Sequence, residues 1–408
     1  MAERASFRLL VVGYGQTEIT FLQRLLRGLV EQGVQVTLAT ASRRVLKSFP
    51  KGSVRWLWAP SWNGGGPTRV ARLLALIMLN LASPRKAWLR TQLRQAKTPR
   101  QRFETLYRYL PFGRGKWDLI YFPWNSAAID YLGLYELGIP VVVSCRGSQV
   151  NIRPHLPGQE GFKEKLIISL RKAAMVHCVS EQIRQEVLSF GIEQEKTAVI
   201  HPALDPNFFR PGIPAGNEGK LRLITTGALI WRKGYEYLLQ AAQQLQQAQL
   251  DFELSIIGGG VERQRLLFTI ADLGLAGRVH LLGQLEPAAV LQHLQQADVF
   301  VLSALSEGIS NAVLEAMSCG LPVVTTACGG MREAVSDGVE GFVVPIRDSE
   351  TMAAALCKLA ADPILRQRMG QAGRERILKD FQLSGQVEAF IRLCNQAQAA
   401  GLIAEQDG

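Results

Sequence analysis

The sequence predicts an α/β protein made of two doubly wound domains that follow each other along the chain. A length of 408 residues exceeds one ordinary hydrophobic core and suggests two domains of about 200 residues each. With 47% apolar and 20% charged residues, the composition is that of a packed globular protein. Both halves alternate short apolar runs with longer amphipathic stretches, which is the pattern of a parallel sheet covered by helices.

The first half opens with the apolar run FRLLVVG, which predicts a strand that ends in the loop Gly13-Tyr14-Gly15. Helices are expected over about residues 17–32 and 181–190. Further strands are expected at residues 34–40, 118–122, 140–145, 175–180 and 197–202. The stretch at residues 202–220 is rich in Pro and Gly and is the natural linker.

The same pattern restarts after the linker. Strands are expected at residues 221–227, 252–260, 279–283, 299–305 and 322–327, and the chain is mostly helical beyond residue 348. We therefore expect an N-terminal domain over residues 1–203, a C-terminal domain over 204–380, and a final helix within 381–408 that packs back on the N-terminal domain. Ligands of doubly wound sheets bind at the carboxyl ends of strands, so the cleft between two facing domains is the expected site.

The net charge of +11 is concentrated in one stretch of the first half. Residues 69–116 hold twelve of the 46 Lys and Arg residues but one of the 35 acidic residues, so the rest of the chain is balanced. A solvated helical insertion would explain this stretch. A surface for anionic lipid would also explain it, because apolar side chains lie among the charges: Leu73, Leu74, Leu76, Ile77, Leu79, Trp88 and Leu89. Nucleic acid is disfavoured as a partner, since no recognition motif accompanies the basic residues.

The sequence favours a cytoplasmic protein, which would be peripheral at the membrane if this basic stretch binds lipid. The longest apolar run, residues 73–82, is about half the roughly 20 residues that a membrane span needs. The N-terminus lacks a small-residue cleavage site and fits a strand better than a signal peptide. The six cysteines are scattered without a C-x-x-C pair, which favours reduced thiols over a zinc site or a disulfide framework.

The segment LSALSEGISNAVLEAMSCGLPVV, residues 302–324, carries the strongest chemical signal. A helix is expected over residues 310–318, and Glu307 and Glu315 are eight residues apart, which corresponds to roughly 12 Å of helical rise. This is about the reach of a nucleotide sugar from its sugar, past the diphosphate, to its ribose. The helix start between the two acids offers free N–H groups to an anion. Taken alone, the pair also fits an ordinary solvated helix face.

A second segment, TTGALIWRKGYEYLL, predicts a strand, a glycine-containing loop and a helix. It places Arg232 and Lys233 at the end of the loop, where a lysine can meet a diphosphate as a compact charge. An ordinary solvated loop charge is the alternative. In a third segment, the backbone around Leu281 could pair with the edge of a base.

From about residue 221 to 345, these motifs resemble the retaining glycosyltransferases of family 4, often called group 1, which have the GT-B fold. The matching segments are GALIWRKG at 227–234, IIGGG at 256–260, EGISNAVLEAMSCGLPVV at 307–324, GGMREAV at 329–335 and GVEGFVVP at 338–345. The resemblance implies two Rossmann-like domains facing across a cleft, with the sugar donor in the C-terminal half. The N-terminal half, which usually recognises the acceptor, matches in VSEQI at 179–183 and in its strand order.

The resemblance also implies roles for individual residues. Glu307 looks like the first acid of the family's E-x7-E pair, which binds the transferred sugar, and Glu315 like the second, which holds the ribose hydroxyls. Lys233 looks like the lysine that neutralises the diphosphate. The backbone from Gly308 through Ile309 and Ser310 to Asn311 would complete the donor cradle. No D-x-D motif occurs, which agrees with a family that needs no metal, and no cofactor beyond the donor is implied.

Two positions depart from the family pattern. Ala228 stands where many members have an arginine after the loop glycine, and Arg232 is the available substitute. Arg146 stands where many members have a histidine; it remains cationic but is a poor proton acceptor. We expect Gly13, Gly15 and Arg146 to line the acceptor side of the cleft.

The sequence therefore predicts a retaining, metal-independent glycosyltransferase that moves a hexose-type sugar from a UDP- or GDP-sugar to a saccharide or lipid-linked acceptor. By resemblance, polysaccharide or lipid-linked saccharide assembly is the setting. Two alternatives stay open. A nucleotide-sugar epimerase would need a proton-transfer group beside the sugar, and a non-catalytic nucleotide-sugar-binding protein would explain Ala228 and Arg146.

Overall fold

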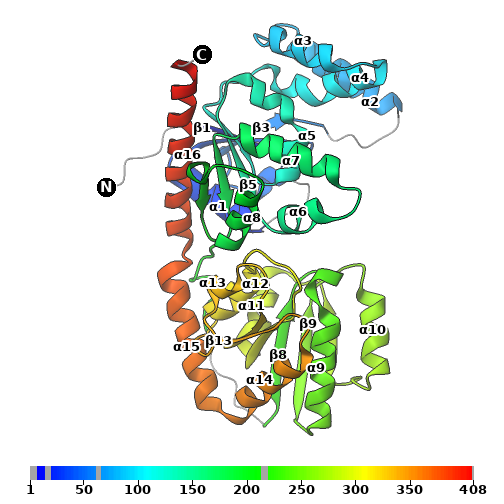
Figure 1. Ribbon diagram of the computed structural model, residues 1–408, viewed down its shortest axis with the longest axis vertical. Helices are drawn as coiled ribbons and strands as arrows, with labels where there is room; N and C mark the ends of the chain where they lie inside the picture. Colours follow the sequence, from blue (N-terminus) through cyan, green and yellow to red (C-terminus); the bar gives the residue numbers. More distant parts are fainter. Residues whose placement is uncertain (1–6, 14–19, 61–65, 213–218, 407–408) are drawn as a thin grey trace. The chain divides into compact units, whose positions relative to one another are not determined.

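The chain forms two compact units, each built around one parallel sheet (Figure 1). This computed structural model describes residues 7–13, 20–60, 66–212 and 219–406. Unit 1 comprises Met1–Cys178, Arg184–Ile200 and Val387–Gly408, and unit 2 comprises Val179–Ile183 and His201–Gln386. No helix in these described ranges is both long enough and apolar enough to cross a membrane.

Unit 1 contains a seven-stranded sheet in the order β3-β2-β1-β4-β5-β6-β7, and all its strands are parallel. The strands are β1 (Arg8–Val12), β2 (Gln35–Thr40), β3 (Val54–Trp58), β4 (Leu119–Phe122), β5 (Val141–Cys145), β6 (Met175–Cys178) and β7 (Thr197–Val199). Strands β4 and β5 are buried along their whole length, as expected of parallel strands that are covered on both faces. The strand order reverses between β1 and β4, which places a topological switch point at their carboxyl ends.

Helices cover this sheet, and the C-terminal helix is one of them. The helices are α1 (Thr20–Glu31), α5 (Asn125–Asp130), α6 (Ser148–Asn151), α7 (Glu160–Lys172), α8 (Glu181–Ser189) and α16 (Leu383–Gln406), with 3-10 turns at Arg43–Ser48, Leu110–Gly113, Leu132–Leu137, Arg153–His155 and Gln194–Lys196. Phe390 of α16 is completely buried, and its ring centroid lies 4.8 Å from that of Tyr121 on β4. Val387 fills the space above Gly28 of α1, where a Cβ would overlap it.

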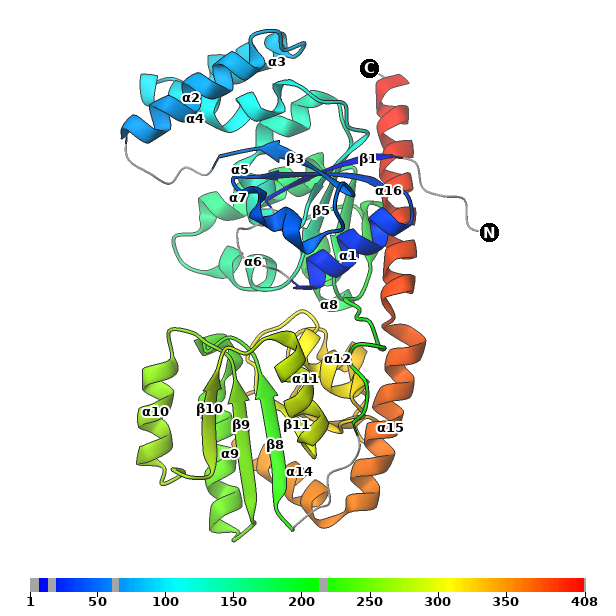
Figure 2. The ribbon, with the colours of Figure 1, turned by 180° about the vertical axis from the view of Figure 1, so that it is seen from behind.

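Three further helices, α2 (Gly66–Asn80), α3 (Lys86–Gln95) and α4 (Pro99–Tyr109), lie together beyond β3 in both views of unit 1 (Figures 1 and 2). They form the basic stretch and enclose a small core of Leu73, Leu76 and Tyr107. Trp88 is tied inward, because its indole Nε1 donates to the carbonyl of Gly133 at 2.9 Å. The helical insertion is thus a packed subdomain of unit 1.

Unit 2 contains a six-stranded parallel sheet in the order β10-β9-β8-β11-β12-β13. Its strands are β8 (Leu221–Thr226), β9 (Phe252–Ile257), β10 (Val279–Gly283), β11 (Val299–Leu302), β12 (Val323–Thr326) and β13 (Gly341–Val344). Successive side chains of β11 enter different clusters: Val299 and Val301 join one core, and Phe300 and Leu302 join the other. The order reverses between β8 and β11, which defines the switch point of this unit.

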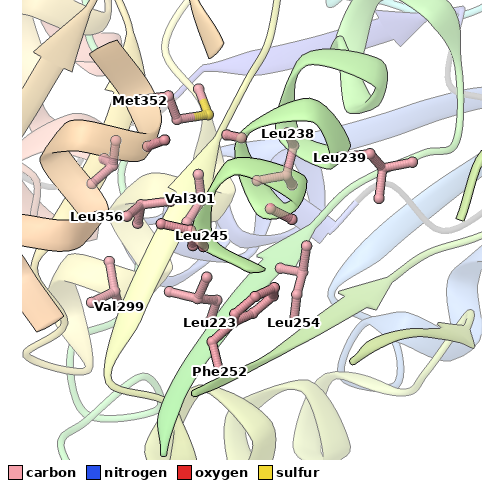
Figure 3. Close-up of a cluster of buried hydrophobic side chains, with 14 of the residues drawn as sticks. Leu223, Leu238, Leu239, Leu245, Phe252, Leu254, Val299, Val301, Met352 and Leu356 are labelled. Atoms are coloured by element: carbon pink, nitrogen blue, oxygen red, sulfur yellow. The ribbon is translucent and has the colours of Figure 1, made fainter. Parts of the chain in front are cut away.

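Helices cover both faces of the second sheet. They are α9 (Tyr235–Gln247), α10 (Arg263–Asp272), α11 (Pro287–Gln296), α12 (Asn311–Ser318), α13 (Met331–Ala334), α14 (Ser349–Ala361) and α15 (Pro363–Asp380), with a 3-10 turn, η6, at Trp231–Lys233. On one face, Leu238 of α9 and Met352 of α14 pack over Leu223 and Phe252 of the sheet (Figure 3). The other face is covered mainly by α11 and α12.

The predicted α/β, doubly wound architecture is confirmed in both units. Two strands were not predicted from the sequence, β3 and β13. Both are edge strands, and the first carries the exposed Arg55. Three predicted features lie partly or wholly outside the described residues: Gly15, the start of the helix at residue 17, and the middle of the linker, residues 213–218.

Candidate active site

The switch point of unit 2 brings two loops together, one after β8 (residues 227–234) and one after β11 (residues 303–310). Strands β8 and β11 are hydrogen-bonded neighbours, so their carboxyl ends share one edge of the sheet. The backbone N–H of Leu305 donates to the carbonyl of Arg232 at 2.8 Å. This hydrogen bond fixes the two loops to each other. Both loops belong to segments for which the sequence predicted binding of the nucleotide sugar.

Glycines allow the loop after β8 to approach its neighbours closely. Gly258, at φ +148°, lies so near the carbonyl oxygen of Gly227 that a Cβ would overlap it. At Gly234, with φ +59°, a Cβ would likewise overlap the carbonyl oxygen of Ser303. Both glycines belong to the segments GALIWRKG and IIGGG, so their role in the sequence pattern is to let backbone pack on backbone.

The side chains of Lys233 and Glu307 meet at this point. Lys233 Nζ donates to Glu307 Oε1 at 2.5 Å, and the two side chains are 16% and 19% exposed. Ser303 Oγ donates to the Lys233 carbonyl at 2.9 Å and holds the lysine's own backbone. From the sequence, both Lys233 and Glu307 were expected to bind the nucleotide-sugar donor, but their contact with each other was not predicted.

Two neutral groups flank this ion pair. Burial, and after it the charge of Glu307, raises the pKa of Tyr235, whose hydroxyl donates to the carbonyl of Gly227 at 3.1 Å. Burial outweighs a hydrogen bond from Thr326 and raises the pKa of the Cys328 thiol to about 11. Neither group is ionised at neutral pH, so neither adds a negative charge beside Glu307.

Helix α12 begins at Asn311, directly after the second loop. Ser310 occupies the N-cap position with extended backbone, but its side chain makes no capping hydrogen bond. The N–H groups of the first turn therefore keep their capacity to bind an anion. Within the predicted cradle from Gly308 to Asn311, Gly308, Ile309 and Ser310 are buried residues, and the backbone N–H of Ser310 donates to Met331 Sδ at 3.4 Å.

The expected spacing of about 12 Å between Glu307 and Glu315 does not follow, because it assumed helical rise throughout. Helix α12 begins only at Asn311, so half of the separation is loop. Glu315 is half-buried on the helix. Burial of the Cys319 thiol, and after it the charge of Glu315, raises the pKa of Cys319 to about 12. The two acids thus lie on different elements.

A turn after β12 supports the loop that carries Glu307. The N–H of Gly330 donates to the carbonyl of Gly308 at 2.6 Å, and a Cβ on Gly329 would overlap the carbonyl of Glu307. The segment GGMREAV contributed to the family resemblance, but no role was predicted for its glycines. Two successive glycines after a strand were the available signal.

Glu333, in the same segment, holds the start of α8. Its carboxylate accepts hydrogen bonds from the backbone N–H groups of Glu181 at 2.8 Å and Gln182 at 3.3 Å, and from His201 Nε2 at 2.9 Å. Burial alone would raise the pKa of Glu333, but these hydrogen bonds together lower it. Glu333 thereby joins GGMREAV to VSEQI, two segments that the sequence analysis quoted separately.

Leu281 and Arg232 were also predicted to contact the donor. Leu281 lies on the edge strand β10, where it pairs with Ile256, and the register shifts before Gly283. The backbone at this strand end departs from the regular ladder. Arg232 is half-buried and uses its carbonyl to hold Leu305.

Gly13 and Arg146, two of the three residues predicted for the acceptor, lie at the carboxyl edge of the sheet of unit 1. Gly13 follows β1 at φ +89°, and a Cβ there would overlap the Cβ of Ala127 on α5. Gly15 lies outside the described residues. Arg146 follows β5; its Nε donates to the carbonyl of Pro123 at 3.2 Å, and its guanidinium lies 4.6 Å from the ring centroid of Phe21.

A chain of buried hydrogen bonds extends inward from Arg146. Its NH2 group donates to the Tyr121 hydroxyl at 3.2 Å, which lies 2.8 Å from Ser144 Oγ, which in turn lies 2.7 Å from His177 Nδ1. His177 Nε2 lies 2.8 Å from the carbonyl of Ile200, which can only accept, so Nε2 carries a hydrogen. This network was not predicted from the sequence. Tyr121, Ser144 and His177 come from three different strands and form no local sequence pattern.

In the described part of the chain, no group of three His, Cys, Asp or Glu side chains could hold a metal ion. All six cysteines are free thiols, and five of them are buried. Lys233 and the start of α12 are the groups at the unit 2 switch point that could compensate the charge of an anion.

Two parallel doubly wound units, the second with a lysine, a glutamate and an uncapped helix start at its switch point, define a protein of the GT-B class. The solved structure of HepE from Anabaena in complex with UDP and glucose has the same fold, with a TM-score of 0.70 and 17% identity over 95% of this chain and 98% of that one. Residues 20–208 match the family described as "Glycosyltransferase Family 4", and residues 211–376 match "Glycosyl transferases group 1". The chain belongs to this glycosyltransferase family.

Curated relatives agree with the family. The lipopolysaccharide core biosynthesis glycosyltransferase LpsE of Rhizobium meliloti is 32% identical over 171 residues, which are 42% of this chain and 48% of that protein. The GDP-mannose-dependent alpha-(1-6)-phosphatidylinositol monomannoside mannosyltransferase of Mycolicibacterium smegmatis is 34% identical over 198 residues, 45% of this chain and 52% of that protein. The match thus spans about half the length of these relatives.

Proposed function

We propose that the protein transfers a hexose-type sugar from a UDP- or GDP-sugar to a saccharide or lipid-linked acceptor, with retention of configuration and without a metal. The observation that carries the proposal is the ion pair of Lys233 and Glu307 at the switch point of unit 2, beside the uncapped start of α12. A cation and free N–H groups suit a diphosphate, and a carboxylate suits sugar hydroxyls.

In the proposed reaction, Lys233 and the first turn of α12 stabilise the negative charge that develops on the leaving diphosphate. Such preorganised groups act without reorganising in the transition state. Glu307 orients the transferred sugar, and Glu315 holds the ribose. The bond between the anomeric carbon and the phosphate oxygen breaks as the acceptor oxygen attacks from the same face, and the leaving phosphate accepts the acceptor's proton.

The names of the relatives support both donor bases. The mycobacterial relative is named for GDP-mannose, whereas the HepE structure contains UDP and glucose. LpsE is named for lipopolysaccharide core biosynthesis, which supports a saccharide or lipid-linked acceptor. In this proposal the acceptor contacts unit 1 near Gly13 and Arg146, and the protein works in the cytoplasm.

The test is the release of nucleoside diphosphate from a panel of UDP- and GDP-hexoses, run with and without EDTA and with Lys233→Ala as control. A thermal-shift screen against the same panel identifies the base, since a ligand at 100 times its dissociation constant stabilises by about 2.7 kcal/mol. Activity should persist in EDTA, and its complete loss there would overturn the metal-free mechanism. NMR of a product glycoside reports retention or inversion directly.

A second candidate, a non-catalytic protein that binds a nucleotide sugar, is favoured by Arg146 and Ala228. Arg146 is held as a cation against a phenol and a carbonyl, so it offers no base. Binding of a nucleotide sugar with no release of nucleoside diphosphate, with or without acceptors, would select this candidate.

A further inference from the structure

Helix α2 is apolar on two sides, although only one side is covered. Leu73 and Leu76 are buried against α4 in the small core of the insertion. Val70, Leu74 and Met78 are 48%, 58% and 68% exposed. Leu79 and Leu81, near the end of the helix, are exposed to a similar extent.

The exposed side chains form a continuous stripe. Val70, Leu74 and Met78 are four residues apart, so they are neighbours along one side of the helix. A helix on the surface of a soluble domain ordinarily carries polar residues on its open side. Between Val70 and Leu81 the sequence has one charged residue, Arg72, and its guanidinium lies 3.5 Å from the hydroxyl of the buried Tyr107. A solvated insertion gives no reason for this stripe.

Strong positive charge follows the stripe along the chain. Lys86, Arg90 and Arg94 lie four residues apart on α3, and Lys97 follows directly; all four are exposed. Within the described part of the chain, none of their side chains forms an ion pair. Because the residues outside 69–116 are balanced in charge, this subdomain carries the whole excess of the protein.

We propose that helices α2 and α3 dock the protein on an anionic lipid bilayer. The apolar stripe of α2 enters the boundary between headgroups and acyl chains, and the cations of α3 contact the anionic headgroups. Helix α2 has 15 residues, which is too short to span a bilayer but suits a helix that lies in the interface. Nucleic acid would match the charge but would leave the apolar stripe without a partner.

The side chains that face the lipid differ from those suggested by the sequence. The indole of Trp88 donates a hydrogen bond to the carbonyl of Gly133, and Leu73 and Leu76 are buried in the core of the insertion. Of the apolar residues named from the sequence, Leu74 and Leu79 remain as exposed members of the stripe.

The test is co-sedimentation with vesicles of phosphatidylcholine, alone or mixed with phosphatidylglycerol, at low and high salt. The protein should sediment with the anionic vesicles and be released by about 1 M salt, where the Debye length falls to about 3 Å. Arg90→Gln/Arg94→Gln/Lys97→Gln should weaken the partition coefficient by about a hundredfold, since each cation near the surface contributes about 1 kcal/mol. Leu74→Ser/Met78→Ser should also weaken it, and the residual binding should be released at a lower salt concentration than that of the wild type.

Matched controls separate this surface from net charge and from general stickiness. Lys172→Gln/Arg368→Gln/Lys379→Gln removes the same charge from exposed positions elsewhere, and Phe268→Ser/Ile364→Ser removes exposed apolar side chains from unit 2. Both controls should sediment like the wild type. A wild type that stays in the supernatant with anionic vesicles at low salt would overturn the proposal, as would equal losses in the controls. Binding to poly(U) without binding to vesicles would instead identify a nucleic-acid surface. The readout is binding, so the result stands apart from the proposed reaction.

Discussion

The contact between Lys233 and Glu307 predicts that one substitution will strengthen nucleotide binding while it weakens catalysis. The Lys233 ammonium is paired with the Glu307 carboxylate at 2.5 Å, so a diphosphate must share Lys233 with Glu307. Glu307→Gln keeps the shape of the side chain and removes its charge. The lysine is then free to pair with the diphosphate alone.

The size of this effect follows from Coulomb's law. Phosphate oxygens bound to Lys233 Nζ would lie within about 8 Å of the Glu307 carboxylate, given the short distance between the two side chains. At that distance two unit charges repel by about 2 kcal/mol at an effective dielectric constant of 20, and by about 1 kcal/mol at 40. Glu307→Gln should therefore tighten the binding of a nucleoside diphosphate by about 5- to 30-fold. Transfer should become slower, chiefly through kcat, because the sugar hydroxyls lose a charged acceptor and the Gln side chain keeps only one neutral acceptor oxygen.

Calorimetric titration with UDP and GDP measures the first effect, and nucleotide release from the preferred donor measures the second. Glu350→Gln removes one negative charge from an exposed position on the first turn of α14 and serves as the control. Its affinity for the nucleotide should equal that of the wild type. If Glu307→Gln binds the nucleoside diphosphate no more tightly than the wild type, Lys233 is not the group that meets the phosphates.

Three further substitutions test the remaining parts of the site. Lys233→Ala should lower turnover by about 10²-fold or more, the scale of one preorganised charge-stabilising group, and near-native steady-state kinetics would contradict its role. Glu315→Gln should mainly raise KM, because contacts to the ribose are equal in the ground and transition states; a lower kcat with unchanged KM would mean that the donor lies the other way round. Glu333→Gln should lower the melting temperature at neutral pH. Because the pKa of Glu333 is lowered in the folded state, its carboxylate stabilises the fold above the unfolded value of about 4.3, and this contribution is lost as the pH falls through the folded value. A difference in melting temperature that stays constant down to about pH 3 would refute this explanation.

The parts of the fold that could be predicted from the sequence are those with a strong local signal. Strand β4, LIYF, is apolar throughout and could be recognised by eye, whereas β3, VRWLW, combines an exposed arginine with an edge position and was missed. The helix after Glu307 was placed within one residue, since Gly320 marks its end and its apolar positions have helical spacing. Such signals depend only on residues near each other in the chain.

Contacts between residues far apart in the sequence could not be predicted, nor could the side of an apolar helix that is buried. The pairing of Lys233 with Glu307 joins residues from two loops, and only the reversal of strand order between β8 and β11 brings those loops together. On α2 both sides are apolar, so periodicity alone could not show that Leu73 is buried and Leu74 is exposed. The role of Glu333 depends on three partners, none of which is close to it in sequence.

The chain of hydrogen bonds behind Arg146 has a consequence for the dynamics of protons in unit 1. Since the Ile200 carbonyl fixes a hydrogen on Nε2 of His177, the neutral form of the ring can only accept the Ser144 hydrogen bond at Nδ1; in that form Ser144 accepts from Tyr121, and Tyr121 accepts from Arg146. For the neutral ring, one arrangement of hydrogens satisfies every one of these four links. The Nε2 hydrogen of His177 is buried against the Ile200 carbonyl, so its exchange with solvent should report opening of the sheet.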